Sequence, residues 1–358
     1  MVGVCAAAVA HIATAGASGA ESQHKFDTSK ASAESVGMDE KDYQSGGTQD
    51  SKNTRATPVI KKPYGVMEIQ RGWDNAAPMG CVFQTNPAQG FPGWHDIEAT
   101  EGTYDWTKIA DQLKLRPRGK FMGLTIGMLP SPPAWLASKG VKIYSVQHGG
   151  VAGRMVPWFN PWDAIAQPYL LRFIQALCQR IDGQVDYLVM DGVGVVTESY
   201  IADLNVIGET ADQALMNWSG STNRIIDQYG SYLRSTPFIM AIAPPIPGYK
   251  PSLDSLGTII RSKLDQWPLF GVSNYGLNGS TNYQGGFLPN VLIHEGSTAG
   301  HFCGFQFSTQ YALHGTFADA LNAALGCGAR YVEAWGGDAE NQANAAAIAD
   351  FNAKCQTA

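Results

Sequence analysis

VDYLVMDGVGVVTESY, residues 185–200, combines an apolar run, two glycines and a glutamate. Residues 185–190, which are apolar apart from Asp186, predict a short strand that is buried on both faces. Gly192 and Gly194 end this run, because glycine permits the turns that a strand end needs. Glu198 follows just beyond, where parallel α/β barrels gather their catalytic side chains. Glu198 is therefore a candidate catalytic residue, and the alternative is an ordinary solvated loop carboxylate.

The composition indicates a large globular domain without a nucleic-acid partner. A chain of 358 residues, 44% of them hydrophobic, can bury the core of one barrel domain of about 300 residues. The net charge of −6 is mild, and we find no basic stripe, zinc-type Cys/His spacing or phosphate-binding glycine motif. No nucleotide, metal or other cofactor is therefore expected. Few charges and many Trp and Tyr residues are typical of extracellular proteins that handle neutral polar ligands.

The first sixty residues differ from the rest of the chain. Residues 1–20 are small and apolar and predict a signal peptide, truncated because no Lys or Arg precedes Lys25. Residues 21–62 are polar and predict a disordered linker, since they cannot bury enough apolar surface to order. A secreted or periplasmic protein without a membrane span is expected. Of the later cysteines, Cys327 and Cys355 bracket the last strand and helix and could pair after export.

Residues 63–358 alternate between strand and helix patterns. Eight short strands, most of them separated by helices, predict a single (β/α)₈ TIM barrel rather than an open doubly wound sheet. Residues 290–294 (NVLIH) fit either a helix or a strand. The predicted strands are residues 65–70, 80–84, 120–126, 185–190, 238–243, 270–273, 301–307 and 329–335.

Two segments carry a family resemblance. WHDIEATEGTYDW (residues 94–106) resembles the W-x-x-[IL]-E-P-x-E-G-x-Y-[DN]-[WF] segment of β-galactosidase-like (family 42-like) glycosidases, with Ala99 in place of the usual proline. PPAWL (residues 132–136) is similar to a second segment of the same enzymes. These enzymes belong to clan A, the retaining glycoside hydrolases built on the (β/α)₈ barrel.

The resemblance implies positions for two catalytic residues. The acid/base glutamate of the clan ends strand four, which matches Glu198, preceded here by Thr197 instead of asparagine. The nucleophilic glutamate of the clan ends strand seven, and Gln306 stands there. A neutral amide cannot act as the nucleophile.

The partner carboxylate must then come from elsewhere, because glycoside hydrolysis needs two carboxyl groups. Glu333 is the first candidate, since VEAW (residues 332–335) puts it on the same side of strand eight as Trp335. We expect it at the barrel rim, within about 10 Å of Glu198; the alternative is a structural pair with an arginine such as Arg71. Glu295 qualifies only if residues 290–294 form a strand, and Glu68 is expected to be a structural carboxylate in the barrel lumen.

Aromatic and amide side chains near strand ends suit a sugar-binding cleft, because pyranose rings offer apolar C–H faces and many hydroxyls. Each single tryptophan could instead be a packing residue. Trp158 and Trp162, after strand three, could extend the cleft or only anchor their loop. The predicted substrate-binding residues are Trp73, Asp74, Trp135, Asn274, Tyr275, Gln306 and Trp335.

Two functions remain open at this point. One is a secreted glycosidase that cleaves a neutral oligo- or polysaccharide by carboxylate acid/base catalysis. The other is a non-catalytic or inactivated carbohydrate-binding barrel, which the glutamine at position 306 would explain.

Overall fold

The computed structural model describes residues 62–69, 78–84, 93–116, 118–147, 155–195, 197–308 and 310–357. Several predictions concern residues outside these ranges. They are the signal peptide, the linker apart from its last residue, and the roles of Arg71, Trp73 and Asp74.

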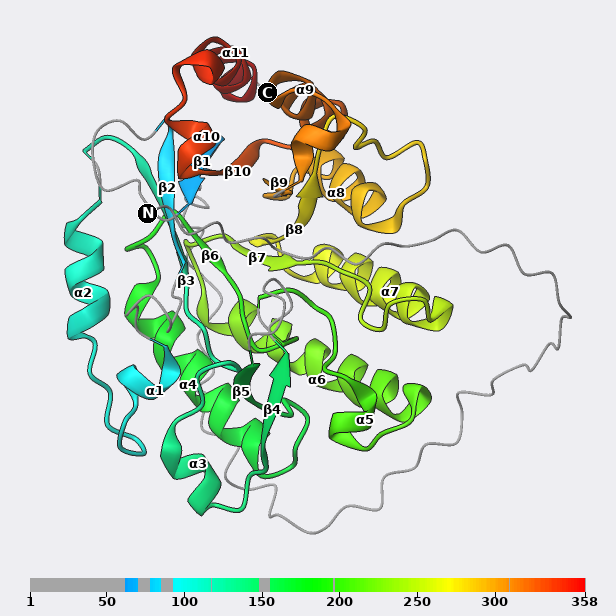
Figure 1. Ribbon diagram of the computed structural model, residues 1–358. Coiled ribbons are helices and arrows are strands. Elements are labelled where there is room, and N and C mark those ends of the chain that lie inside the picture. Colours follow the sequence, from blue (N-terminus) through cyan, green and yellow to red (C-terminus); the bar gives the residue numbers. More distant parts are fainter. Residues whose placement is uncertain are drawn as a thin grey trace, which may run out of the picture. The chain divides into compact units, whose positions relative to one another are not determined.

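Eight parallel strands close into a barrel, which confirms the predicted fold class (Figure 1). Going round the barrel, the strand order is β1-β10-β9-β8-β7-β6-β3-β2. Each strand lies within or overlaps one of the eight predicted segments. The strands are β1 (Gly65–Ile69), β2 (Gly80–Gln84), β3 (Phe121–Thr125), β6 (Tyr187–Val189), β7 (Phe238–Ala241), β8 (Phe270–Leu277), β9 (Gly304–Phe307) and β10 (Tyr331–Trp335).

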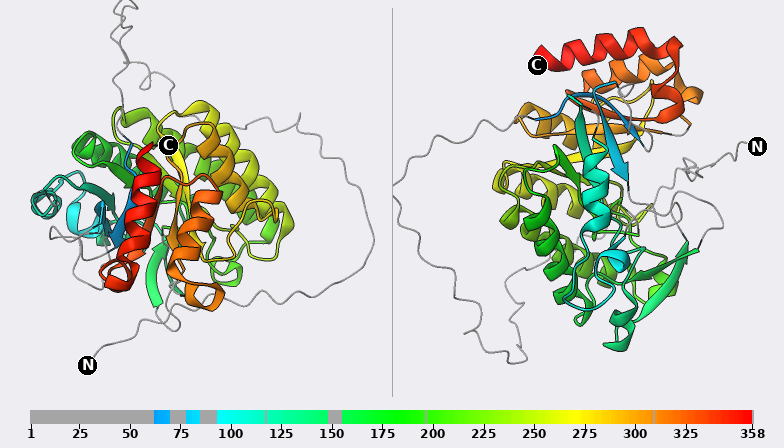
Figure 2. Two further views of the ribbon diagram at one scale, coloured as in Figure 1. Left: turned by 90° about the horizontal axis from the view of Figure 1, so that it is seen from above. Right: turned by 90° about the vertical axis from the view of Figure 1, so that its left-hand side faces the viewer.

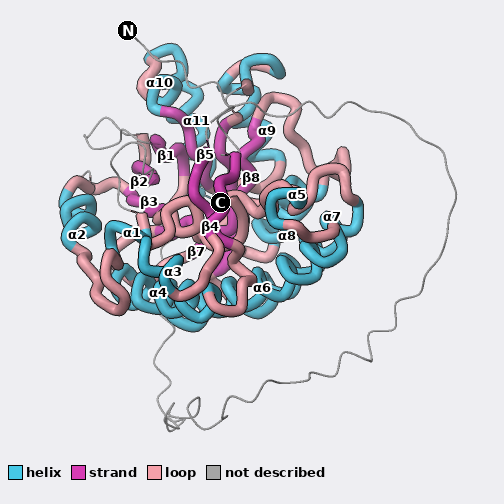
Figure 3. The backbone as a smooth tube through the Cα atoms, turned by 60° about the horizontal axis from the view of Figure 1, so that its bottom comes forward, coloured by secondary structure: helices cyan, strands magenta, loops and turns pink. Residues whose placement is uncertain are grey.

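Helices form the outer layer around these strands (Figure 3). Neighbouring helices pack on one another, as α9 and α11 do side by side (Figure 2). The helices are α1 (Trp94–Ile97), α2 (Thr107–Lys114), α3 (Ala134–Ser138), α4 (Ala166–Ile181), α5 (Leu204–Ile207), α6 (Ala211–Tyr232), α7 (Lys250–Gln266), α8 (Leu288–Thr298), α9 (Phe317–Gly326), α10 (Gly336–Ala339) and α11 (Ala345–Thr357), with 3₁₀ turns at Tyr311–His314 and Gln342–Asn344.

Helix α8 resolves the ambiguous segment. Residues 290–294 are helical, with Pro289 in the first turn, where a proline is tolerated. Glu295 therefore lies on a helix surface, where the Arg261 guanidinium Nε donates to its carboxylate at 2.8 Å. The structure thus removes Glu295 from the candidates for catalysis.

Side chains alternate between the lumen and the helix layer along each strand. The lumen is filled mainly by large side chains from the early, middle and late parts of the barrel domain: Met67, Val82, Phe121, Tyr187, Val189, Ile239, Phe302 and Tyr331. On β1, Met67 belongs to this inner cluster and Val66 to the outer core. Glu68, next in the alternation and paired in register with Cys81, therefore faces the helix layer. The prediction that Glu68 is a lumen carboxylate is wrong.

The long segment between β3 and α4 contains an antiparallel hairpin. Its strands are β4 (Ile143–Gln147) and β5 (Met155–Phe159), drawn in green in Figure 1. Trp158 on β5 is completely buried. The hairpin is an addition to the barrel that extends the outer core toward the loop carrying Glu198.

Two further findings concern sequence-based expectations. Cys327 and Cys355 are both buried, and each has a free thiol, so the structure does not pair them. Within the described ranges, no helix combines the length and the apolar character needed to cross a bilayer.

Candidate active site

Glu198 lies beside the carboxyl end of the barrel. It pairs in parallel fashion with Ala241, the last residue of β7. The neighbouring Ser199 donates its backbone N–H to the Ala241 carbonyl at 3.1 Å. Its hydroxyl donates to the carbonyl of Ala243 at 2.6 Å and accepts the Ala243 N–H at 2.8 Å. These bonds make the backbone around Glu198 a short extension of the sheet.

The Glu198 carboxyl is suited to donate a proton. The residue as a whole is partly exposed, but its carboxyl group lies in desolvated surroundings, and this burial raises its pKa to about 7. An ordinary glutamate is ionised at neutral pH, whereas this group keeps a substantial protonated fraction. A general acid needs a pKa near the working pH, so Glu198 has the property that its predicted role requires.

Glu333 lies deeper than predicted. It is completely buried, and its register partners are Met67 on β1 and Gln306 on β9. Layers in such barrels take their side chains from alternate strands. Neighbouring strands of the closed barrel are also staggered by about one residue. When this stagger is added to the strand pairings, Glu333 lies in one layer with Val82, Val189 and Ser273.

The prediction that Glu333 lies at the rim is therefore wrong. Strand β10 continues for two residues beyond it, to Trp335. Glu198 stands above this layer, because it pairs with the end of β7. Alternation along a strand fixes which face a side chain occupies, whereas its height depends on the stagger of the closed barrel.

A tyrosine hydroxyl, rather than an arginine, is bonded to Glu333. The Tyr187 hydroxyl donates to Oε1 at 3.1 Å, and Oε2 has no hydrogen-bond partner among the described residues. Burial raises the pKa of Glu333 to about 8, although the bond from Tyr187 opposes this rise. The Glu333 carboxyl is thus mostly protonated at neutral pH.

The charge of Glu333 acts on three lumen tyrosines. Burial raises the pKa values of Tyr187, Tyr275 and Tyr331 well above the ordinary value, and in each case the charge of Glu333 adds the next largest contribution. The pKa of Tyr275 also responds to the charge of Glu198. The Tyr275 hydroxyl therefore lies within electrostatic reach of both carboxyl groups.

Gln306 occupies the strand-seven position that the resemblance assigns to a nucleophile. It is 93% buried on β9 and lies opposite Glu333 in register. Its side chain faces the lumen, because Gly304, two residues earlier, has its absent Cβ directed at the ring of Tyr331. Trp335 lies near the same edge and donates its indole N–H to the Phe307 carbonyl at 3.2 Å.

Asn274 does not face the lumen. Its amide donates to Oδ1 of Asn290 on α8 at 2.9 Å, and its own Oδ1 accepts the Gly276 N–H at 3.0 Å. On β8 the lumen face belongs to Ser273 and Tyr275, so the residue between them points toward the helices. The prediction that Asn274 binds substrate hydroxyls is wrong.

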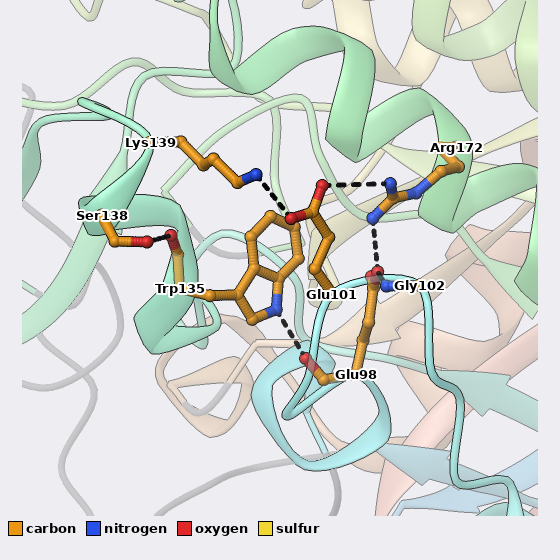
Figure 4. A network of polar contacts seen from close by, with 7 residues as sticks. All are labelled: Glu98, Glu101, Gly102, Trp135, Ser138, Lys139 and Arg172. Atoms are coloured by element: carbon orange, nitrogen blue, oxygen red, sulfur yellow. Dashed lines mark hydrogen bonds and ion pairs between the residues drawn. The ribbon is translucent and has the colours of Figure 1, made fainter.

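Trp135 packs at the contact between residues 94–106 and residues 132–136, the two segments that carry the family resemblance (Figure 4). Its indole N–H donates to the Glu98 carbonyl at 2.8 Å, and the Arg172 guanidinium lies 5.7 Å from the ring centre. The ring also meets Trp94 edge-on, with 6.1 Å between centroids. These contacts describe a packing residue, and none of them involves the residues gathered around Glu198.

A buried carboxylate stands at the centre of that network. The Glu98 carboxylate is fully buried and accepts hydrogen bonds from the Trp94 indole and the Gly102 N–H, both at 2.7 Å, and from Arg172. Glu101 pairs with Lys139 at 2.6 Å and also meets Arg172 (Figure 4). Glu98 and Glu101, both within residues 94–106, therefore hold the loop after β2 against α3 and α4.

Trp158 and Trp162 anchor their loop. Trp158 is completely buried, and the Trp162 indole donates to the Glu209 carboxylate at 2.8 Å. The packing alternative is therefore the one that the geometry supports for both residues.

The residues predicted from the sequence include Tyr275 but neither Tyr187 nor Tyr331. Tyr331 lies two residues before Glu333 and shares its face, so strand alternation in RYVEAW could have identified it. Tyr187 is the first residue of β6 and could have been found in the same way. Asp191 was likewise not identified: burial raises its pKa to about 7, and its carboxyl accepts backbone N–H groups from Met128 and Gly192.

The described residues contain no group of three or more His, Cys, Asp or Glu side chains placed to hold a metal ion. No protein-family model matches this sequence, and no curated protein matches it.

Solved structures do match the fold. A β-galactosidase from the psychrophilic Marinomonas ef1 is 11% identical with a TM-score of 0.50, over 82% of this chain and 59% of that one. Xylanase 10B from Thermotoga petrophila RKU-1, in complex with xylobiose, is 10% identical with a TM-score of 0.47, over 77% and 82% of the two chains. Native xylanase 10B from Thermotoga maritima is 11% identical with a TM-score of 0.46, over 77% and 83%. At these identities the similarity concerns the fold.

Proposed function

We propose that this protein is a glycoside hydrolase that cleaves a neutral oligo- or polysaccharide with Glu198 as general acid. The observation that carries the proposal is the Glu198 carboxyl itself. It lies at the carboxyl edge of a (β/α)₈ barrel, and burial raises its pKa to about 7. Fold similarity to a β-galactosidase supports β-linked glycosides as the first substrates to test.

Glu198 would protonate the leaving oxygen of the glycosidic bond. As that bond breaks, the positive charge of an oxocarbenium-like transition state would develop on the sugar ring, and a water molecule would add to the anomeric carbon and return a proton to Glu198. Glu333 is the candidate that stabilises this charge from below, because nearby positive charge favours the ionised form of a carboxyl group. Glu333 releases its proton with a pKa of about 8, so its ionised form becomes common only in mildly alkaline solution or when such a charge develops.

Tyr275, Gln306 and Trp335 complete the proposed site. Tyr275 lies within electrostatic reach of both carboxyl groups, while Trp335 offers a flat apolar ring that suits the C–H face of a pyranose. The buried Gln306 amide can both donate and accept hydrogen bonds, which suits sugar hydroxyls. Export of the chain, predicted from residues 1–20, is part of the same proposal.

One observation favours a second candidate function, a carbohydrate-binding barrel without turnover. Gln306 faces the lumen at the strand-seven position, and Glu333 lies a layer below the rim. A site in which Glu198 is the only carboxyl group at the rim would bind sugars but would lack the second carboxylate that hydrolysis needs.

Hydrolysis of a panel of β-linked glycosides separates the two functions. Wild type, Gln306→Glu and Glu333→Gln are assayed for released sugar, with Glu295→Gln on the surface of α8 as the control. The hydrolase proposal expects turnover by wild type and the control, and a loss in Glu333→Gln. A wild type that binds these glycans without turnover, together with activity gained by Gln306→Glu, would establish the binding barrel instead.

A further inference from the structure

In the segment between β6 and Glu198, two consecutive backbone carbonyls accept hydrogen bonds from side chains instead of from a neighbouring strand of the barrel. Gly192 turns the chain with a φ of +103°, which favours glycine. The next two carbonyls, of Val193 and Gly194, accept hydrogen bonds from indole N–H groups. Trp218 donates to the Val193 oxygen at 2.8 Å, and Trp158 donates to the Gly194 oxygen at 3.3 Å.

The two tryptophans belong to independent elements. Trp218 lies on α6 in the helix layer, and Trp158 lies on β5 of the added hairpin. Both rings are completely buried, and Trp158 also contacts the rings of Tyr144 and Trp162. A packed indole has few orientations, so its single N–H is a fixed donor. The two carbonyls are thereby fixed relative to both elements.

Direct backbone contact transmits this position to Glu198. A Cβ added at Gly194 would lie 1.9 Å from the backbone carbonyl oxygen of Glu198 and 2.8 Å from that of Tyr200. The Val195 N–H also donates to the Tyr200 oxygen at 3.1 Å. The chain thus folds back so tightly that Gly194 and Glu198 touch, and a shift of one moves the other.

We propose that Trp158 and Trp218 are positioning residues, whose indole N–H groups hold the loop that presents the Glu198 carboxyl at the rim. The proposal rests on the proposed function of Glu198. It gives the hairpin, which lies outside the barrel proper, a role at the site.

Phenylalanine substitutions test the proposal, because they keep an aromatic ring and remove the N–H donor. The variants are Trp158→Phe and Trp218→Phe. Trp267→Phe is the matched control, because the Trp267 indole donates to Asp227 Oδ1 at 2.9 Å, between α6 and the end of α7. The titration of Glu198 is followed by NMR of ¹³C-labelled glutamate carboxyls, assigned with Glu198→Gln. Unfolding by urea, kcat and KM on a β-glycoside are measured for each variant.

We expect both test variants to lower the Glu198 pKa from about 7 by about one unit, because a loosened loop admits water. Losing one hydrogen bond that holds the acid should also lower kcat by up to about tenfold, while KM stays within about twofold. The control should lose stability and keep both the Glu198 pKa and kcat.

An unchanged Glu198 pKa in both test variants, with stability lost as in the control, would show two packing residues and overturn the proposal. The titration needs no substrate, so it decides the matter even if wild type has no turnover and the proposed function fails. If one variant does not fold, the other alone gives the same decision.

Discussion

Replacing Glu333 with glutamine should change how stability depends on pH. Burial raises the pKa of this carboxyl from 4.5 to about 8, so the folded state holds the proton more tightly than the unfolded chain. Such a group stabilises the fold at low pH, and its contribution is lost as pH rises from about 4.5 to about 8. A shift of this size corresponds to an upper limit of about 5 kcal/mol.

Glutamine keeps the shape of the protonated carboxyl and cannot ionise. The variant should therefore resemble wild type at pH 5 and exceed it in free energy of unfolding by a few kcal/mol at pH 8.5. The pKa values of Asp191 and Glu198 are also raised, so these groups also make the free energy of unfolding depend on pH. Their contribution is the same in wild type and variant and cancels in the difference between the two proteins.

Urea unfolding followed by tryptophan fluorescence measures this difference at pH 5, 7 and 8.5. Glu295→Gln, which breaks only the exposed pair with Arg261, is the control and should follow wild type at every pH. A Glu333→Gln variant whose difference from wild type is the same at pH 5 and pH 8.5 would refute the reasoning, because Glu333 would then be ionised in the fold.

Three further predictions concern the network in Figure 4, the glycines and the pH profile. Glu98→Gln should lower the free energy of unfolding by about 1.5–3 kcal/mol, since the buried side chain loses its charge-assisted hydrogen bond with the partly exposed Arg172; urea unfolding measures this, and a loss no larger than that of Glu101→Gln would contradict it. Gly194→Ala should abolish most turnover because its Cβ would meet the Glu198 carbonyl, whereas Gly220→Ala, with open space on α6, should raise stability by roughly 0.5–1 kcal/mol; an active Gly194→Ala enzyme would show that the loop is not tightly packed. The plot of kcat/KM against pH should be bell-shaped with limbs near about 7 and about 8, because one carboxyl must be protonated and the other ionised; an optimum near pH 5 would contradict the two raised pKa values.

The barrel could be predicted from the sequence because its signals are local. Apolar runs bounded by glycine and proline marked all eight strands, and the end of the fourth strand led to Glu198. The ambiguity at residues 290–294 could not be removed locally, since a short apolar run fits a helix as well as a strand.

The site could be predicted only in part, because it depends on the closed barrel. Alternation correctly put Glu333 and Trp335 on one face, but the depth of Glu333 follows from the stagger of eight strands. Asn274 was assigned by its nearness to a strand end, although β8 continues to Leu277 and turns that side chain outward. Trp135 was assigned in the same way, and its partners Glu98 and Arg172 come from distant segments.

The role of Glu198 as general acid is the central claim, and the dependence on the leaving group tests it most directly. A sugar or alkyl leaving group needs a proton as the bond breaks, whereas dinitrophenolate leaves without one. The measurement is kcat/KM of wild type and Glu198→Gln on a β-glycoside of each kind. We predict a loss of roughly 10²- to 10⁴-fold on the sugar leaving group and little loss on the dinitrophenyl glycoside. Equal losses on both substrates, or none on either, would contradict the assignment of Glu198 as the acid.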